Sequence, residues 1–78
     1  MSTKVRIYSR RGCHLCEVAM DKARELQPEF GYELEEVFID GDSDLTASYG
    51  EQVPVIHIND KPHDFFRIDE ARFRAALA

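Results

Sequence analysis

The chain has 78 residues, with 10 Lys and Arg against 15 Asp and Glu and a formal net charge of -5. This length predicts a single domain over residues 1–78, and 44% hydrophobic with 32% charged residues is typical of a globular chain. The acidic balance disfavours nucleic acids and anionic membranes as partners, because both attract basic proteins. Neither a signal-peptide core nor a membrane-spanning apolar run is present in the sequence, so we expect a cytoplasmic monomer.

The first part of the chain predicts a strand followed by an amphipathic helix. Apolar and polar residues alternate over Val5–Tyr8, which favours a strand ending at Ser9. A helix is expected from His14 to about Gln27, with Pro28 ending it. The residues near one face of this helix, which we expect to be the buried face, are Leu15, Val18, Ala19, Lys22, Ala23 and Leu26.

The middle of the chain predicts a second strand and a short helix. Residues 34–39 end in Val37, Phe38 and Ile39, an apolar run that is typical of a strand covered on both faces. Residues 43–49 then favour a short helix with a Ser or Asp cap and Gly50 as its stop.

The last third predicts a hairpin and a final helix. Residues 55–58 form an apolar strand, residues 59–62 have the composition of a turn, and residues 63–66 provide a partner strand. Asp69 is placed to cap a helix that runs to about Leu77.

The order of these elements, β-α-β-(α)-β-β-α, decides the fold class. A strand-helix-strand unit requires a right-handed crossover between parallel strands, whereas the hairpin must be antiparallel. We therefore predict an α/β protein with a four-stranded mixed sheet flanked by helices.

The cysteines carry the strongest functional signal. Cys13 and Cys16 have C-x-x-C spacing, which two randomly placed cysteines in this length would show about once in 40 chains. A disulfide closing so short a loop removes little entropy from the unfolded chain, so structural stapling explains the spacing poorly. The spacing instead points to redox chemistry.

Local charge favours Cys13 as the reactive sulfur. The predicted helix begins at or just after Cys13, so its free backbone N–H groups and positive dipole end point at that sulfur. Arg10 and Arg11 add two cations, and both effects stabilise a thiolate. Cys16 lies one turn further along and is placed to resolve a mixed disulfide formed at Cys13. His14 would support the thiolate when protonated or be merely solvated, and the sequence leaves both open.

Two other interpretations of the cysteines remain. Reduced cysteines can be small buried fillers of the core. A C-x-x-C pair is also half of a zinc site, and His14, His57 and His63 are available as ligands, although their spacings do not match a zinc finger. We predict no metal, and we regard His57 and His63 as ordinary imidazoles of a sheet or its surface.

Residues 8–16, Tyr-Ser-Arg-Arg-Gly-Cys-His-Leu-Cys, followed by Val53-Pro54, resemble the glutaredoxins of the thioredoxin superfamily. The resemblance covers nearly the whole chain and is greatest to small bacterial glutaredoxin-like proteins that end in a hairpin, an aromatic pair, a capping Asp and a short helix. It implies a thioredoxin-like fold, with Cys13 attacking and Cys16 resolving.

The same resemblance implies the rest of the site. Val53-Pro54 would be a cis-proline segment facing the cysteines, where the Val53 backbone pairs with an extended substrate; a trans proline opening a strand is the alternative. Residues expected to contact the substrate are Arg10, Arg11, His14, Leu15, Val53, Pro54 and Asp69.

The reductant that restores the cysteine pair would be glutathione or a reductase. Two departures from the glutaredoxin pattern concern glutathione. Glutaredoxins usually carry Gly-Gly before an Asp that helps to hold glutathione, whereas Asp64-Phe65 or Phe66-Arg67 occupies this region here. Gln52 also replaces the threonine that commonly precedes Val-Pro. Side chains would meet glutathione where only glycine fits, so we predict weak dependence on glutathione and no other cofactor.

We therefore predict a thiol–disulfide oxidoreductase that acts on protein or small-molecule disulfides. The alternative is a non-catalytic thioredoxin-like adaptor, or a module that binds zinc or an iron–sulfur cluster through Cys13.

Overall fold

The computed structural model describes residues 3–78 and contains the elements in the predicted order. Their bounds are β1 (Lys4–Ser9), α1 (His14–Phe30), β2 (Glu33–Phe38), α2 (Ser43–Tyr49), β3 (Val55–Ile58), β4 (Lys61–Phe65) and α3 (Glu70–Leu77). Within residues 3–78, no helix combines the length and the apolar content that a membrane crossing requires.

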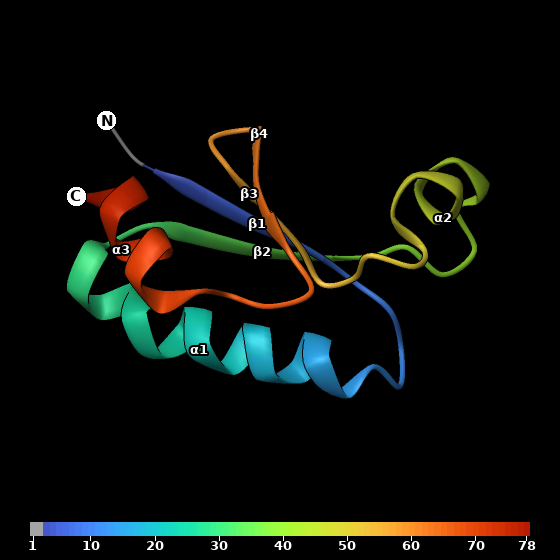
Figure 1. The fold of residues 1–78 in the computed structure, drawn as a ribbon, viewed down its shortest axis with the longest axis horizontal. Coiled ribbons are helices and arrows are strands. Elements are labelled where there is room, and N and C mark those ends of the chain that lie inside the picture. Colours follow the sequence, from blue (N-terminus) through green and yellow to red (C-terminus); the bar gives the residue numbers. More distant parts are fainter. Residues whose placement is uncertain (1–2) are drawn as a thin grey trace.

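The strands form one mixed sheet, which confirms the predicted fold class. Their order is β2-β1-β3-β4, with β1 and β2 parallel and the other two pairs antiparallel. Helices α1 and α3 lie on the same face of the sheet, and α2 lies beyond one end of it (Figure 1). The right-handed crossover of β1-α1-β2 explains why α1 packs back onto the sheet.

Strand β2 is an edge strand, so the expectation that it would be covered on both faces was wrong. Phe38 is 42% exposed, and only Ile39, just beyond the strand, is fully buried. The two interior strands are β1 and β3, and β1, between β2 and β3, buries alternate residues Val5, Ile7 and Ser9. The apolar run near residue 38 therefore contributes Ile39 to the cluster at the end of the sheet and does not form an interior strand.

Helix α1 continues past Pro28, which does not end it. The helix ends at Gly31, whose left-handed backbone (φ 71°) lets its N–H donate to Gln27 O at 2.7 Å. A proline in the last turn removes one backbone hydrogen bond, and the glycine cap closes the helix after it.

The buried face of α1 is rotated from the predicted one. Leu15 and Val18 are 52% and 50% exposed, and Lys22 also lies outside the core. Residues that actually face the sheet are Cys16, Ala19, Met20, Ala23 and Leu26. The i, i+3, i+4, i+7 spacing of these residues makes a continuous stripe, with Cys16 at its first turn.

The hairpin between β3 and β4 is closed by Asn59 and Asp60, both with positive φ (51° and 65°). Positive φ at both central residues is typical of a type I′ turn, which matches the twist of the flanking strands. The Asn59 side chain also accepts a hydrogen bond from Lys4 N at 2.9 Å, and Asp60 pairs with Arg6 at 2.7 Å. These contacts hold the hairpin against β1.

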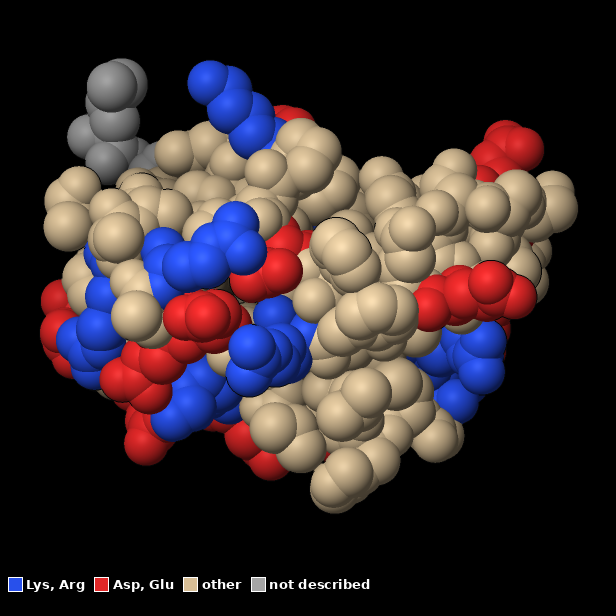
Figure 2. Space-filling view, in the orientation of Figure 1, with Lys and Arg blue, Asp and Glu red and all other residues tan. Residues whose placement is uncertain are grey.

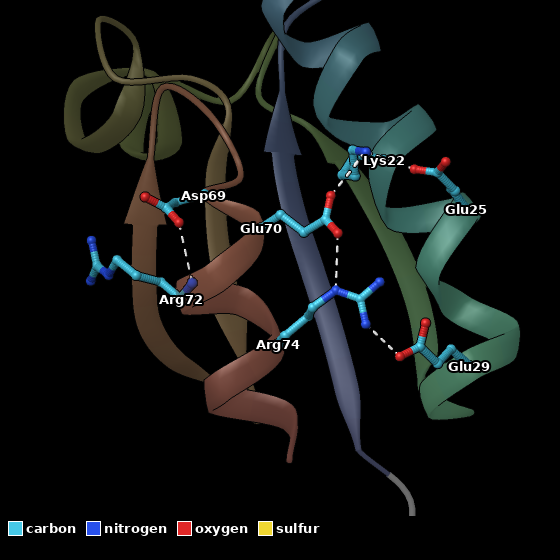
Figure 3. A network of polar contacts seen from close by, with 7 residues as sticks. All are labelled: Lys22, Glu25, Glu29, Asp69, Glu70, Arg72 and Arg74. Carbon is cyan, nitrogen blue, oxygen red and sulfur yellow. Dashed lines mark hydrogen bonds and ion pairs between the residues drawn. The ribbon is translucent and has the colours of Figure 1, made fainter.

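The main core lies between the sheet and the two helices on its face. Phe73 of α3 is fully buried there, against side chains of β1, β3 and α1. As predicted, Asp69 caps α3, accepting a hydrogen bond from Arg72 N at 3.2 Å. Figure 3 shows the polar contacts that also link α3 to α1, in which Glu70 lies between Lys22 and Arg74. Exposed ion pairs of this kind add little stability individually.

A second, smaller cluster lies at the other end of the sheet, near α2. Its buried members are Cys16, Ile39 and Val53, and Tyr8, Cys13, Leu45 and Tyr49 pack against them. Segments far apart in the sequence therefore meet around the cysteine pair.

Candidate functional site

Cys13 occupies the first position of the candidate site, at the start of α1. Gly12 before it has φ 72°, a left-handed conformation that a side chain would strain, and Cys13 N donates to Arg10 O at 3.3 Å. This turn makes Cys13 the N-cap of α1, and its Sγ accepts a hydrogen bond from the backbone N–H of Cys16 at 3.3 Å. The half-buried Cys13 sulfur therefore lies at the positive end of the helix dipole.

Cys16 has the opposite environment. It is 2% exposed, and the two cysteines are not joined in a disulfide. Burial raises the pKa of the Cys16 thiol to about 11, and its proximity to Cys13 adds to the shift. One sulfur is accessible at a helix start, whereas the other is buried and protonated at neutral pH.

The two arginines upstream of Cys13 are engaged by different partners. The Arg10 guanidinium donates to the carbonyl of Gly50, at the end of α2, at 2.9 Å. Arg11 donates its backbone N–H to Asp40 at 3.0 Å, and its guanidinium lies 4.8 Å from the centre of the Phe38 ring. Both cations thus stay beside the cysteine turn while tying it to α2 and to the end of β2.

A groove of about 510 Å³ opens beside the cysteines, on the side of α1 that faces the edge of the sheet. Besides both cysteines and the turn before them, α1 and β2 contribute its lining residues, which are Glu17, Met20, Asp21, Arg24, Glu36 and Phe38. Charges of both signs therefore surround the reactive sulfur in a space large enough for part of a small molecule or a peptide.

Sequence reasoning missed Glu17, Asp21, Arg24 and the β2 residues of the groove. Their spacing offered a signal, since Cys13, Glu17, Asp21 and Arg24 fall at i, i+4, i+8 and i+11 along one side of the helix. Strand β2 contributes to the groove only because the β1-α1-β2 crossover brings it beside α1, and no pattern of neighbouring residues in the sequence predicts this.

The segment before β3 packs directly against the cysteine pair. The Val53–Pro54 peptide bond is cis, and Val53 contacts the cluster that contains Cys16. Both residues of the segment are buried. Phe66 N donates to the Pro54 carbonyl at 2.8 Å, which fastens the end of β4 to this segment.

Phe66 also has φ 71°, a left-handed conformation that glycine adopts freely and phenylalanine does not. It stands in the region where the glutaredoxin resemblance expects a glycine pair. Phe66 is 46% exposed and its ring packs on that of Phe65, with 4.9 Å between ring centres. The backbone at Phe66 therefore has a conformation typical of glycine, while the exposed Phe65 and Phe66 rings occupy the space beside it.

The remaining predicted contact residues lie outside the groove. His14 is largely exposed, with its Nδ1 3.9 Å from a carboxylate oxygen of Glu17. Leu15 lines a separate shallow hollow with Phe66. On the face that Figure 2 shows, the surface over the N-terminal half of α1 and the chain after β4 has few charged groups, whereas charges of both signs gather over α3. Asp69 serves as the helix cap already described.

His57 and His63 do not line the groove beside the cysteines. His57 is buried against Tyr8 and Tyr49, and burial lowers the pKa of both imidazoles. Among residues 3–78, His, Cys, Asp and Glu side chains do not converge in any group of three that could hold a metal ion.

The sheet order, the cysteine pair at the start of the helix after β1 and the Val53–Pro54 segment against it define a protein of the thioredoxin fold. The X-ray structure of Fasciola hepatica thioredoxin superposes with a TM-score of 0.68 and 21% identity, over 97% of this chain and 78% of that one. Glutaredoxin 1 from Francisella tularensis superposes with a TM-score of 0.55 and 24% identity, over 95% and 91% of the two chains.

Sequence comparison places the protein more narrowly within this fold. The family described as glutaredoxin-like domain (DUF836) matches residues 4–78, and the chain belongs to it. A Nitrosomonas europaea protein solved by NMR is 36% identical, with a TM-score of 0.88 over 100% of this chain and 94% of that one. The resemblance noted in the sequence is thereby confirmed.

Proposed function

We propose that the protein is a thiol–disulfide oxidoreductase in which Cys13 attacks a disulfide and Cys16 resolves the product. The observation that carries this proposal is the contrast between the two sulfurs. Cys13 is accessible at the start of α1 and accepts the Cys16 N–H, whereas Cys16 is buried with its pKa raised to about 11. A nucleophile needs the first environment, and a resolving thiol held in reserve fits the second.

In the first step the Cys13 thiolate attacks one sulfur of a substrate disulfide. A bond forms between Cys13 Sγ and that sulfur, the substrate S–S bond breaks, and the other substrate sulfur leaves as a thiolate. The Cys16 N–H and the helix dipole stabilise the anion before attack. Arg10 and Arg11 add positive charge at the same turn, which supports the same form.

In the second step Cys16 attacks Cys13 Sγ. A disulfide forms between the two cysteines, the bond to the substrate breaks, and the Cys16 proton passes to the departing substrate thiolate. The pair has then given two electrons to the substrate. An external thiol donor, glutathione or a reductase of the thioredoxin type, returns two electrons and two protons to restore the dithiol.

The groove and the Val53–Pro54 segment are the places where a substrate would lie. An extended chain can pair with the backbone of another segment as an added strand does, and Val53 packs in the same cluster as Cys16. Mixed charges along the groove favour a target cysteine flanked by polar residues. A reducing compartment such as the cytoplasm would keep the pair in its dithiol form.

A disulfide-reduction assay tests the proposal with Cys13→Ser, Cys16→Ser and the exposed control Ser48→Ala. We expect Cys13→Ser to be inactive and Cys16→Ser to accumulate a mixed disulfide at Cys13, detected by mass spectrometry. Ser48→Ala should behave as wild type. Activity in both cysteine variants equal to wild type would overturn the proposal, and so would purification of the wild type with bound zinc or an iron–sulfur chromophore needed for its folding.

The electron donor is tested separately, by comparing NADPH-driven turnover through glutathione and glutathione reductase with turnover through a thioredoxin reductase. Phe65 and Phe66 occupy the region where glutaredoxins carry glycines, so we expect the glutathione route to be the slower one. Efficient turnover with glutathione would contradict this expectation while leaving the roles of the cysteines intact.

A further inference from the structure

Ser9 is a polar residue in an apolar position. It is the last residue of β1, on the same buried face as Val5 and Ile7, and it has no exposed surface. Among the residues that the structure describes, its Oγ has no hydrogen-bond partner. Buried hydroxyls are almost always paired, because an unpaired one loses its bonds to water without replacement. The position would fold at least as well with alanine, so the hydroxyl calls for another explanation.

Ser9 lies next to the buried cluster that contains the Cys16 sulfur. Its carbonyl accepts a hydrogen bond from Ile39 N at 2.9 Å, and Ile39 packs with Cys16 in that cluster. Burial raises the pKa of Cys16, whereas the Ser9 hydroxyl and the backbone N–H of Arg10 both lower it. Ser9 Oγ makes no hydrogen bond within residues 3–78 while Cys16 is a neutral thiol, although its hydroxyl favours the Cys16 anion. Ser9 Oγ is thus a donor without an acceptor, placed beside the sulfur that must become an acceptor.

We propose that Ser9 donates a hydrogen bond to Cys16 Sγ as this sulfur takes on negative charge in the resolving step. The inference rests on the proposed function, because it concerns how Cys16 completes the exchange. Cys16 must lose its proton inside an apolar cluster formed with Ile39 and Val53, where an unsolvated anion is costly. Ser9 Oγ and Arg10 N replace the water that this anion lacks.

The chemical balance of the step is simple. The Cys16 S–H bond breaks, a bond forms between the two cysteine sulfurs, and the bond between Cys13 and the substrate sulfur breaks. The proton leaves with the substrate thiol, so Ser9 keeps its own proton and acts only as a hydrogen-bond donor.

The other polar groups that pack near Cys16 are less buried than Ser9. Cys13, Tyr8 and Tyr49 pack against the same cluster, and Cys13 is itself consumed in the mixed disulfide. The charged side chains that line the neighbouring groove are not buried either; they are Arg10, Arg11, Glu17, Asp21, Arg24 and Glu36. Ser9 alone among the groups named here is fully buried, neutral and unpartnered.

The test isolates the resolving step. Reduced protein is mixed with a limiting amount of Ellman's reagent, so that Cys13 takes one thionitrobenzoate and Cys16 then releases it as a coloured thiolate, the Cys16 proton passing in this assay to water. We expect Ser9→Ala to form the mixed disulfide at the wild-type rate but to resolve it about tenfold more slowly, as for loss of one charge-assisted hydrogen bond. Ser9→Thr, which keeps the hydroxyl, should restore resolution, and Ser48→Ala serves as the matched control.

Two further readouts separate this role from a structural one. In a Cys13→Ser background, thiolate absorbance against pH should show the pKa of Cys16 moving upward in Ser9→Ala. Urea unfolding should show Ser9→Ala at least as stable as wild type, because an unpaired hydroxyl has been removed. If threonine's extra methyl disturbs the core, the alanine variant decides the question by itself.

Resolution in Ser9→Ala at the wild-type rate, with the Cys16 titration unmoved, would overturn the role of Ser9 alone. Failure of the wild type itself to release thionitrobenzoate from Cys13 would overturn the proposed function, and the role of Ser9 with it.

Discussion

The buried position of Cys16 predicts how the stability of the dithiol form depends on pH. The pKa of this thiol is about 11 in the fold, compared with 9.0 for an unperturbed cysteine, mainly because burial penalises the thiolate. Below about pH 9 the thiol is protonated in both the folded and the unfolded chain, so its contribution is constant. Between about pH 9 and 11 the unfolded chain loses the proton and the folded chain keeps it, which favours unfolding.

The size of the effect follows from the shift of about two pKa units. One unit corresponds to about 1.4 kcal/mol, so the free energy of unfolding should fall by up to about 3 kcal/mol over this range. Tyr32, whose pKa burial raises to about 12, adds a decline that begins at slightly higher pH. Cys16→Ala removes the contribution of Cys16 and keeps that of Tyr32. The difference in unfolding free energy between wild type and this variant therefore isolates Cys16.

The assay is urea unfolding of wild type and Cys16→Ala in the presence of a phosphine reductant at several pH values from about 8 to about 11. At the lowest pH the variant should be the less stable, because the buried sulfur no longer packs. This difference should shrink by up to about 3 kcal/mol as the pH rises. A difference that stays constant over the whole range would show that Cys16 ionises as freely in the fold as in the unfolded chain.

Further substitutions test the fold and the surface around the cysteines. Phe73→Ala should cost about 3–5 kcal/mol in urea unfolding, because this ring is fully buried, and an unchanged midpoint would contradict its place in the core. Asp69→Ala should cost about 1 kcal/mol through loss of the cap on α3 and leave the KM for glutathione unchanged; a raised KM would make Asp69 a ligand instead. Gly12→Ala should cost about 1–2 kcal/mol, since φ there is 72° although a Cβ would meet no neighbour; equal stability would exclude that strain. Phe66→Gly keeps the left-handed backbone and removes the ring, so glutathione-driven turnover should rise, and no change would mean that this ring does not obstruct glutathione.

Local chemistry explains why much of the fold could be predicted from the sequence. Period-two alternation marked β1, and the Asp69 cap marked the start of α3. The turn composition of residues 59–62 predicted the hairpin, although β4 begins at Lys61 and runs to Phe65 rather than over 63–66. The C-x-x-C motif located the candidate site, because the strand before it and the helix start at Cys13 can both be recognised from neighbouring residues. Each of these signals acts between residues a few positions apart, so no knowledge of distant partners is needed.

Long-range pairing decided the rest. The apolar run ending at Ile39 could not reveal that β2 lies at the sheet edge, because strand order depends on which strands pair with β1. Pro28 suggested a helix end, yet Gly31 and the packing of α1 carried the helix past it. The isolation of the Ser9 hydroxyl beside Cys16 also appears only in three dimensions, because burial and hydrogen bonding depend on residues that the chain brings together from β1, α1 and the Val53 segment.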